Sequence, residues 1–354
     1  MTSRERVKRA FTFEKADRMP IDYFGNGGIN AALIKHFNTD YDGVLDALNV
    51  DFRPVWAEYK GKPLYKAAEG YIFDPVYGFY MSWIEHSSGG YWDICNFPLK
   101  DAPDEVIASY PVPDPNDFDY SAVDAIIKKY PGRALYAGNA GMADMINTTG
   151  RVMGMEQALM NFMTGDEATL SYINRLKNME LAQLEKTIQR AKGGIDFMWI
   201  GEDLGTQIAP MVSMELYNRV IRPVHQRFVD LAKTYKLPIM IHTCGSSSWA
   251  YDEFIKMGIN AVDTLQPEAV NMSPEYLIKN FCGRLAFHGS ISTAGPLAYG
   301  TVEDVEKDIK NKCDIYRPTK AYMISPTHAI QDNSPLENVL KMYECAVKYG
   351  QYGD

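Results

Sequence analysis

Two short apolar runs, IDFMWIGED (195–203) and LPIMIHTCG (237–245), and the segment between them decide the fold that this sequence predicts. Each run is rich in isoleucine and methionine and ends in polar residues, as a buried strand does where it meets a loop. The intervening SMELYNRVIRPVHQRFVDLAKTYK (213–236) is amphipathic, with apolar residues every four positions from Leu216 to Phe228. A strand, a helix and a second strand in this order are typical of a parallel sheet.

The same alternation of helix and strand runs from about residue 120 to the C-terminus. About six consecutive units, without a glycine-rich dinucleotide signature or a P-loop after a strand, favour a closed (β/α)8 barrel of the TIM type over a doubly wound sheet. We therefore predict a single α/β barrel domain over residues 1–354. Residues 21–26 are predicted as its first strand, and the aromatic-rich residues 50–115 as an irregular cap inserted near the N-terminus.

The composition argues against several classes of function. A formal net charge of −9 and a pI near 5.3 are unlike those of a nucleic-acid-binding protein. No apolar run reaches the roughly 18 residues that a transmembrane helix needs, and the N-terminus lacks the apolar core of a signal peptide. We expect a cytoplasmic protein without membrane association, whose five scattered cysteines are reduced; a homodimer is left open.

Polar residues gather at the predicted C-terminal ends of the strands, where (β/α)8 barrels carry their active sites. The set includes three of the six histidines and one cysteine. Its members, in chain order, are Asn139, Glu202, Asp203, His242, Cys244, Gln266, Glu268, His288 and His328. Such a concentration indicates groups that either satisfy loop backbone or carry out chemistry.

His242 and Cys244 are the clearest pair in this set. Residues two apart in a strand point to the same side, so the imidazole and the thiolate face one volume. Together they form half of a zinc site; the alternative is a buried cysteine beside a hydrogen-bonded histidine. His328, at another strand end, is the candidate third ligand. Glu268 is the candidate fourth, with a helix cap or a loop hydrogen bond as its alternative role.

Two further groups of residues are candidates for catalysis and substrate binding. Glu202 and Asp203 follow a strand, and one of them is predicted to act as a proton donor, with a helix cap or a salt bridge as the alternative. The aromatic cap is predicted either to line an apolar substrate pocket or to pack as hairpins on the barrel. The candidate substrate-binding residues are Tyr23, Tyr80, Trp83, Tyr91, Trp92, Asn139 and His288.

Four stretches carry a resemblance to a known family: SRERVKRAFTFEKADRMPID (3–22), GEDLGTQIAPMVSMELYNRVIRP (201–223), HTCG (242–245) and ISPTHAIQDNSPLENVLKM (324–342). They resemble the uroporphyrinogen decarboxylase superfamily, and the resemblance covers nearly the whole chain. It implies two branches to be separated, the true decarboxylases and the corrinoid-dependent methyltransferases.

The decarboxylase branch is disfavoured by the segment after Asp17-Arg18-Met19-Pro20. Decarboxylases of this superfamily carry an arginine-rich segment there, which pairs with a substrate that bears many carboxylates. Here the chain continues as IDYFGNGGIN (21–30), which holds no arginine. Carboxylates buried in such a site without counter-charges are costly.

The methyltransferase branch carries H-x-C at one strand end and a later cysteine in an S-P-G-C-like segment, and these residues bind zinc. His242-Thr243-Cys244 matches the first motif, whereas Ser325-Pro326-Thr327-His328 places a histidine where the later cysteine would stand. Imidazole is an acceptable zinc ligand. The resemblance therefore implies a zinc enzyme that works with a corrinoid protein as its partner.

The implied reaction is methyl transfer to or from the cobalt of the corrinoid (cobalamin). We expect a small methyl ether, such as a methoxylated aromatic, to be the methyl donor in an O-demethylation, with zinc as the Lewis acid. One alternative is transfer from methylcobalamin to a thiol such as coenzyme M. Another, of a different class, is a protein that binds a corrinoid or a small ligand without catalysis.

Overall fold

A curled, fully parallel sheet forms the centre of the computed structural model, which describes residues 1–65, 71–74, 76–86 and 89–353. Neighbouring strands pair in the order in which they follow along the chain, apart from the inserted small strands. In that order they are β1 (Phe52–Val55), β7 (Ala134–Gly138), β8 (Phe197–Gly201), β9 (Ile239–His242), β10 (Ala261–Thr264), β11 (Ala286–Ile291) and β12 (Tyr322–Pro326).

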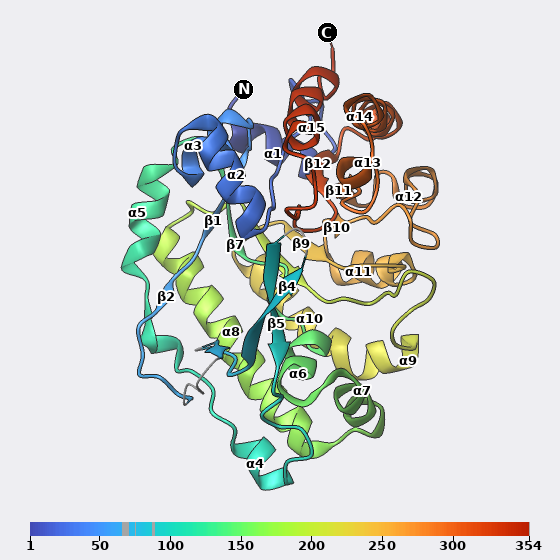
Figure 1. Cartoon of the computed structure of the whole chain (residues 1–354). Helices are drawn as coiled ribbons and strands as arrows, with labels where there is room; N and C mark the ends of the chain where they lie inside the picture. The colour runs from blue at the N-terminus through green and yellow to red at the C-terminus, as the bar shows by residue number, and fades with distance from the viewer. Residues whose placement is uncertain (66–70, 75, 87–88, 354) are drawn as a thin grey trace.

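Helices connect these strands and cover the outside of the sheet (Figure 1). The segment predicted as one helix between β8 and β9 forms α9 and α10, joined by a π-helical turn over Tyr217–Ile221. The connecting helices are α5 (Ser121–Lys129), α8 (Glu167–Ala191), α9 (Met214–Leu216), α10 (Arg222–Thr234), α11 (Tyr251–Met257), α12 (Pro274–Phe281), α13 (Pro296–Tyr299), α14 (Val302–Tyr316) and α15 (Leu336–Tyr349). The remaining helices are α1 (Ser3–Phe11), α2 (Gly27–Phe37), α3 (Tyr41–Ala47), α4 (Asp104–Ser109), α6 (Ile146–Met153) and α7 (Met155–Thr164).

The segment around Ile21 closes the sheet into a barrel. On one side, the Ile324 N–H in β12 donates to the Pro20 carbonyl at 2.8 Å, and the Asp22 N–H donates to the Ile324 carbonyl at 2.8 Å. On the other side, the N–H of Asp51, just before β1, donates to the Ile21 carbonyl at 2.8 Å. The predicted TIM-type α/β barrel is therefore confirmed, and its first strand is this short segment.

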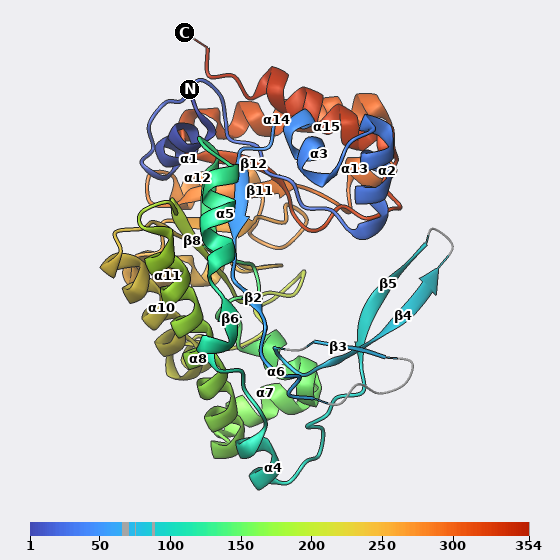
Figure 2. The ribbon, with the colours of Figure 1, turned by 90° about the vertical axis from the view of Figure 1, so that its left-hand side faces the viewer.

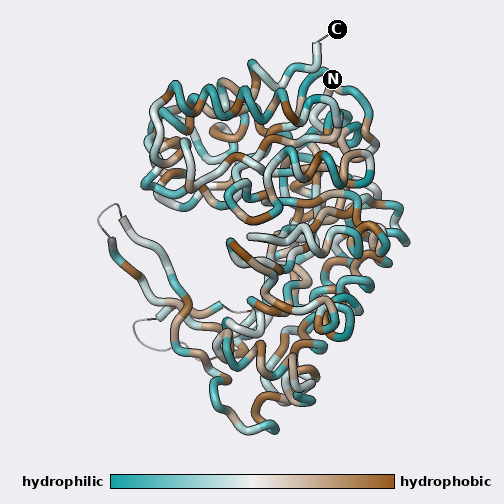
Figure 3. Tube along the Cα trace, turned by 90° about the vertical axis from the view of Figure 1, so that its right-hand side faces the viewer, coloured by the Kyte–Doolittle hydropathy of each residue, from teal (hydrophilic) through white to brown (hydrophobic). Residues whose placement is uncertain are grey.

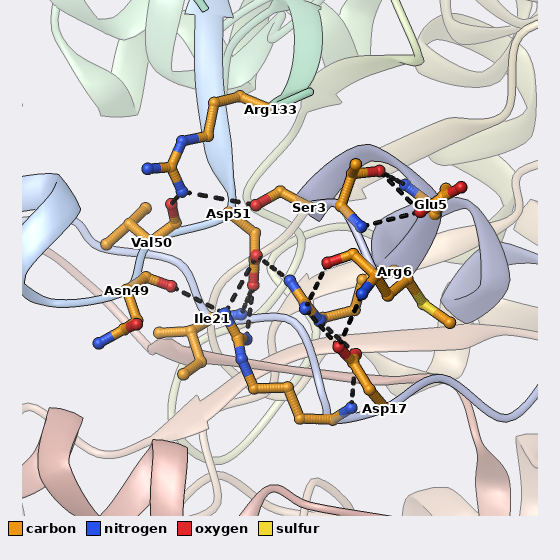
Figure 4. Close-up of polar contacts among 12 residues, drawn as sticks. Ser3, Glu5, Arg6, Asp17, Ile21, Asn49, Val50, Asp51 and Arg133 are labelled. Atoms are coloured by element: carbon orange, nitrogen blue, oxygen red, sulfur yellow. Dashed lines mark hydrogen bonds and ion pairs between the residues drawn. The ribbon is translucent and has the colours of Figure 1, made fainter. Parts of the chain in front are cut away.

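A buried ion cluster holds the closing segment in place (Figure 4). The carboxylate of Asp51, wholly buried, accepts hydrogen bonds from Arg6 Nη1 at 2.6 Å, Arg18 Nη1 at 2.7 Å and the Ile21 N–H at 2.8 Å. Arg6 also donates to both oxygens of Asp17 at 2.7 Å. One carboxylate thus ties α1, the closing segment and the entry to β1 together.

Helix α1 closes one end of the barrel, and the other end carries the polar residues. Val7, Ala10 and Phe11 of α1 belong to one buried cluster with residues from the starts of the strands, such as Phe52 and Phe197. Figure 2 shows α1 on one side of the molecule and the β4–β5 hairpin on the opposite side. The C-terminal ends of the strands therefore lie at the end of the barrel opposite α1. We call this end the barrel mouth.

The structure corrects the expectation that residues 50–115 form one irregular cap. The range begins with β1, which is a strand of the barrel because its buried residues continue the parallel sheet. Beyond it, β2 (Glu58–Tyr59) pairs with β6 (Phe118–Asp119), and β3 (Ile72–Phe73), β4 (Tyr80–His86) and β5 (Gly89–Cys95) form a separate antiparallel sheet. The β4–β5 hairpin projects from the body as an arm (Figure 3). Among the described residues, no helix is long and apolar enough to cross a bilayer.

We predict that Asp51→Ala lowers the free energy of unfolding by about 3–5 kcal/mol, because it leaves the buried guanidinium group of Arg6 and the half-buried one of Arg18 without their shared carboxylate. Urea unfolding followed by circular dichroism measures this change. The matched control is Asp124→Ala, which breaks the Arg190–Asp124 ion pair, whose side chains are 47% and 52% exposed. The control should cost less than about 1 kcal/mol; equal losses in the two variants would contradict the assigned role of Asp51.

Candidate metal centre

Three potential metal ligands converge at the barrel mouth: Asp203, His242 and Cys244. Their ligand atoms all lie within 4.8 Å of one another, and each residue is half-buried. His242 Nε2 lies 3.4 Å from Cys244 Sγ and 3.8 Å from Asp203 Oδ1. His242 is the last residue of β9, Cys244 follows two residues later, and Asp203 follows the end of β8. The predicted His242–Cys244 half-site thus gains a carboxylate from the neighbouring strand.

The geometry of this group suits zinc. Two ligand atoms bound to one tetrahedral zinc at about 2.0–2.3 Å lie roughly 3.3–3.8 Å apart. The two distances from His242 Nε2 are close to these values. Nitrogen, sulfur and carboxylate oxygen are also the donor types that zinc prefers, and three protein ligands leave one position open for a substrate, as in catalytic zinc sites.

Backbone contacts between the two loops hold Asp203 beside Cys244. Asp203 Oδ1 accepts from the Cys244 N–H at 2.9 Å, and Oδ2 accepts from Asn147 Nδ2 at 2.9 Å. Gly245 has φ +68°, and a Cβ there would lie 2.2 Å from the Gly205 carbonyl oxygen. Glycine at this position therefore allows the loop after β9 to approach the loop after β8 closely.

A buried chain of carboxylates and imidazoles lies behind His242. Asp263 Oδ2 accepts from His242 Nδ1 at 2.6 Å, and Asp263 Oδ1 accepts from His288 Nδ1 at 2.6 Å. His288 Nε2 lies 3.2 Å from Asp22 Oδ2. We call Asp22, His288 and Asp263 the carboxylate–histidine chain. His288, a candidate substrate-binding residue, is a member of this chain and is only 1% exposed; its part in substrate binding stays a prediction.

The charges in this chain favour ionised groups despite their burial. Burial alone lowers the pKa of His288, but the carboxylates of Asp263 and Asp22 outweigh it and raise this pKa to about 9. For Asp263, burial raises the pKa, yet His288 and His242 hold it below its usual range. Burial also raises the pKa of the Cys244 thiol, so thiolate formation at neutral pH depends on metal binding, which requires the deprotonated form.

The structure leaves His328 and Glu268 outside the group of converging ligand atoms. His328 is exposed, and its ring centroid lies 6.3 Å from that of Phe24. Partial burial of the imidazole and the charge of His242 lower the pKa of His328. Glu268 is exposed. The prediction that these two residues complete the site stays a prediction; Asp203, which was expected to be a catalytic acid, lies in the converging group with His242 and Cys244.

Glu202 occupies a structural position rather than the mouth. Its side chain is buried, and its two oxygens accept from the N–H groups of Met145 and Ile146, both at 2.9 Å, at the start of α6. His225 Nε2 lies 3.3 Å from Oε2. Burial raises the pKa of Glu202 to about 7. This arrangement matches the helix-cap alternative for Glu202; its catalytic role stays a prediction.

The remaining candidate substrate-binding residues do not converge. Trp83, Tyr91 and Trp92 on the β4–β5 hairpin are about half exposed, and the rings of Trp83 and Trp92 meet edge to face at 5.6 Å. Tyr80 lies on the same hairpin and is half-buried. Tyr23 is buried near the closing segment, where its hydroxyl donates to Asn30 Oδ1 at 2.6 Å. Asn139 is exposed after β7 and accepts from the Gly141 N–H at 2.8 Å.

Comparison with known proteins bears on the family and the fold of the chain. The family model of uroporphyrinogen decarboxylase (URO-D) matches residues 101–349, which is more than half of the chain. The chain belongs to the uroporphyrinogen decarboxylase family. This membership confirms the resemblance that the four sequence stretches carry.

Within the uroporphyrinogen decarboxylase family, the similarity found is to methyltransferases. The chain is 23% identical over 189 residues to the methylcobamide:CoM methyltransferase MtbA of Methanosarcina acetivorans. That alignment covers 53% of this chain and about half, 52%, of the relative. A solved methyltransferase from Methanosarcina mazei superposes with a TM-score of 0.70 over 99% of both chains at 12% identity, which shows a shared fold.

For this family member we predict about one zinc per chain, lost on Asp203→Ala, His242→Ala or Cys244→Ala because each removes a converging ligand. Metal analysis by mass spectrometry after gel filtration measures the content. Asp124→Ala, which breaks an exposed ion pair, is the control and should keep the zinc content of the wild type, whereas Glu268→Ala tests the predicted fourth ligand. Zinc that survives Asp203→Ala but not His328→Ala would make His328 the third ligand in place of Asp203.

The raised pKa of Glu202 gives a second prediction, on the pH dependence of stability. The folded protein keeps a proton on Glu202 up to about pH 7, whereas the ordinary value is 4.5. Between these values the folded state binds more protons than the unfolded state, so rising pH destabilises the wild type. Glu202→Gln removes the pH-dependent loss of stability that Glu202 causes. The free energy of unfolding of the variant relative to the wild type should therefore rise from pH 4.5 to 7, as measured by urea unfolding. A difference that does not change with pH would contradict the raised pKa of Glu202.

Proposed function

We propose that this protein is a zinc-dependent methyltransferase that exchanges a methyl group with the cobalt of a corrinoid protein. The observation that carries the proposal is the convergence of Asp203, His242 and Cys244 at the barrel mouth. The similarity to a methylcobamide:CoM methyltransferase and to a second methyltransferase supports it. Active sites of (β/α)8 barrels lie at this end, where a partner protein can approach the strand ends.

We further propose a small methyl ether as the methyl donor. Zinc bound here would polarise an ether oxygen as a Lewis acid. With one thiolate, one imidazole and one carboxylate, Cys244, His242 and Asp203 donate less electron density than a site with two thiolates, and this favours an oxygen substrate. The methyl carbon would pass to cobalt(I) of the partner, and the electron pair of the carbon–oxygen bond would stay on the departing oxygen, beside the zinc that Asp203, His242 and Cys244 would hold.

In that reaction Asp203 would bind the metal, and exposed aromatic side chains of the β4–β5 hairpin would contact the substrate. Because a carboxylate that binds a metal is ionised, Asp203 acts as a ligand rather than as the predicted proton donor. The exposed rings of Trp83, Tyr91 and Trp92 lie on the arm that projects on the mouth side (Figure 2). Of these, Trp83 and Trp92, whose rings meet edge to face at 5.6 Å, offer aromatic surface on which a methoxylated ring could stack.

A thiol acceptor is the second candidate, and a specific observation favours it. The relative from Methanosarcina acetivorans is named for methyl transfer between a methylcobamide and coenzyme M. In that reaction the three ligands would bind zinc that activates a thiolate, which then takes the methyl group from methylcobalamin. The same three residues could hold zinc in either reaction, so the preference for an ether rests on the lower electron density of their donor set.

The decisive experiment is a methyl-transfer assay with cobalamin followed by visible absorption. With cobalt(I) cobalamin we expect methylcobalamin to form from a methoxylated aromatic and not from methylamines or methyl thiols. Methylcobalamin that is consumed with coenzyme M, while no ether methylates cobalt(I), would establish the thiol candidate instead. His242→Ala should abolish either activity, because the metal has lost a ligand. A metal-free wild type that binds cobalamin without any transfer would establish a binding protein.

A further inference from the structure

We propose that Asp263, backed by His288 and Asp22, is a positioning residue that aims His242 Nε2 at the metal and sets the affinity of the site for zinc. The inference deepens the proposed function and rests on it, since it requires a metal at Asp203, His242 and Cys244. None of the three residues of the carboxylate–histidine chain belongs to the ligand cluster itself.

The hydrogen bonds of the chain decide which nitrogen of His242 is free. A carboxylate only accepts, so at 2.6 Å from Asp263 Oδ2 the Nδ1 of His242 must carry the proton. In a neutral ring, Nε2 then holds the lone pair, and Nε2 is the atom 3.4 Å from Cys244 Sγ. Ligand histidines are oriented in this way by a carboxylate on the other ring nitrogen, which also makes the imidazole a better ligand.

The second oxygen of Asp263 is held as firmly as the first. His288 Nδ1 donates to Asp263 Oδ1 at 2.6 Å, and the far nitrogen of His288 faces Asp22 Oδ2 at 3.2 Å. His288 carries its charge at neutral pH because its pKa is raised to about 9, so it can donate from both nitrogens. Asp263 is therefore oriented from two sides, and its rotation away from His242 would break both bonds.

Burial of the charged groups in the carboxylate–histidine chain costs free energy, so stability alone does not explain their presence. Asp263, His288 and Asp22 are 4%, 1% and 7% exposed. Replacing buried ion pairs by apolar residues of similar size is often neutral or stabilising, so such a chain is weak evidence for a role in stability alone. Asp263 connects the chain to His242, which lies at the barrel mouth.

The backbone next to Asp263 is strained at Thr264 and Leu265. Thr264 has φ +88° and Leu265 has φ +50°, in the left-handed region that β-branched and bulky residues rarely adopt. The Thr264 hydroxyl lies 3.0 Å from His242 Nδ1. Strain of this kind persists where surrounding structure enforces it and concentrates at functional sites. Here it places the side chains of two successive residues, Asp263 and Thr264, against the same ring.

The far end of the chain is anchored by the barrel closure. Asp22 belongs to the segment that pairs with β12, and the Tyr343 hydroxyl donates to its carbonyl at 3.0 Å. The backbone position of Asp22 is thus fixed from two directions. The chain therefore extends from the closing strand through β11 and β10 to the ligand on β9.

The test measures metal affinity in Asp263→Asn, His288→Gln and Asp22→Asn. Zinc binding to the metal-free full-length protein is measured by competition with a chromophoric chelator. Cobalt(II) serves as a second probe, because its visible spectrum reports the ligand geometry. We expect Asp263→Asn to weaken zinc binding by about 10- to 100-fold and to alter the cobalt(II) spectrum. His288→Gln and Asp22→Asn should weaken it progressively less, since each acts through one more hydrogen bond.

The matched control is His225→Gln. It breaks the other buried imidazole–carboxylate contact, His225 with Glu202 at 3.3 Å, which lies outside the ligand cluster. This variant should keep the zinc affinity of the wild type even where its metal-free form unfolds at a lower temperature. Thermal unfolding of each metal-free variant separates lost stability from lost affinity.

The outcomes distinguish the two proposals. A wild type that binds no zinc overturns both the proposed function and this inference. A wild type that binds zinc, with Asp263→Asn binding it equally well, overturns the positioning role alone. An equal loss of affinity in Asp263→Asn and His225→Gln also overturns it, because the effect would then be a general consequence of disturbing a buried pair.

Discussion

The rest of the structure depends on the hydrogen bonds and ion pairs that the buried carboxylate of Asp51 makes. A parallel sheet becomes a barrel only when its first strand meets its last, and here the first strand is no more than the segment around Ile21. Its few backbone hydrogen bonds to β12 are reinforced because Asp51 accepts from the Ile21 N–H and from two arginines. Without a counter-charge inside the protein, either arginine would be costly to bury.

The segment that closes the barrel also contributes a residue to the carboxylate–histidine chain next to the candidate metal centre. The residue after Ile21 is Asp22, whose carboxylate faces His288. The segment that closes the barrel therefore supplies the last member of the carboxylate–histidine chain, which ends at His242. Through this arrangement, the packing that stabilises the fold and the orientation of a proposed metal ligand share one short stretch of backbone.

The sequence predicts the local structure well because periodicity depends on neighbours along the chain. The alternation of apolar runs with amphipathic segments indicates strands and helices, and their number indicates a barrel. The same-side orientation of His242 and Cys244 follows from the two-residue repeat of a strand. The cap was less predictable, since β1 is too short to be distinguished from the irregular, aromatic-rich segment around it.

The roles of Glu202 and Asp203 show where sequence reasoning fails. Adjacent in the chain and alike in chemistry, they were indistinguishable, but one is buried under the start of α6 and the other faces Cys244. Asp263 was missed because it lies inside a strand rather than after one, although a charged residue between apolar neighbours in AVDT (261–264) was a usable signal.

By itself, therefore, the sequence determined the barrel, the family and the His242–Cys244 pair, because each depends on short-range patterns or on a motif. Only the tertiary structure decided that Asp203 joins this pair and that Asp263, His288 and Asp22 stand behind it. These residues come from separate strands, and which side chains meet depends on the register of the closed barrel, a long-range property that no local pattern in the sequence records.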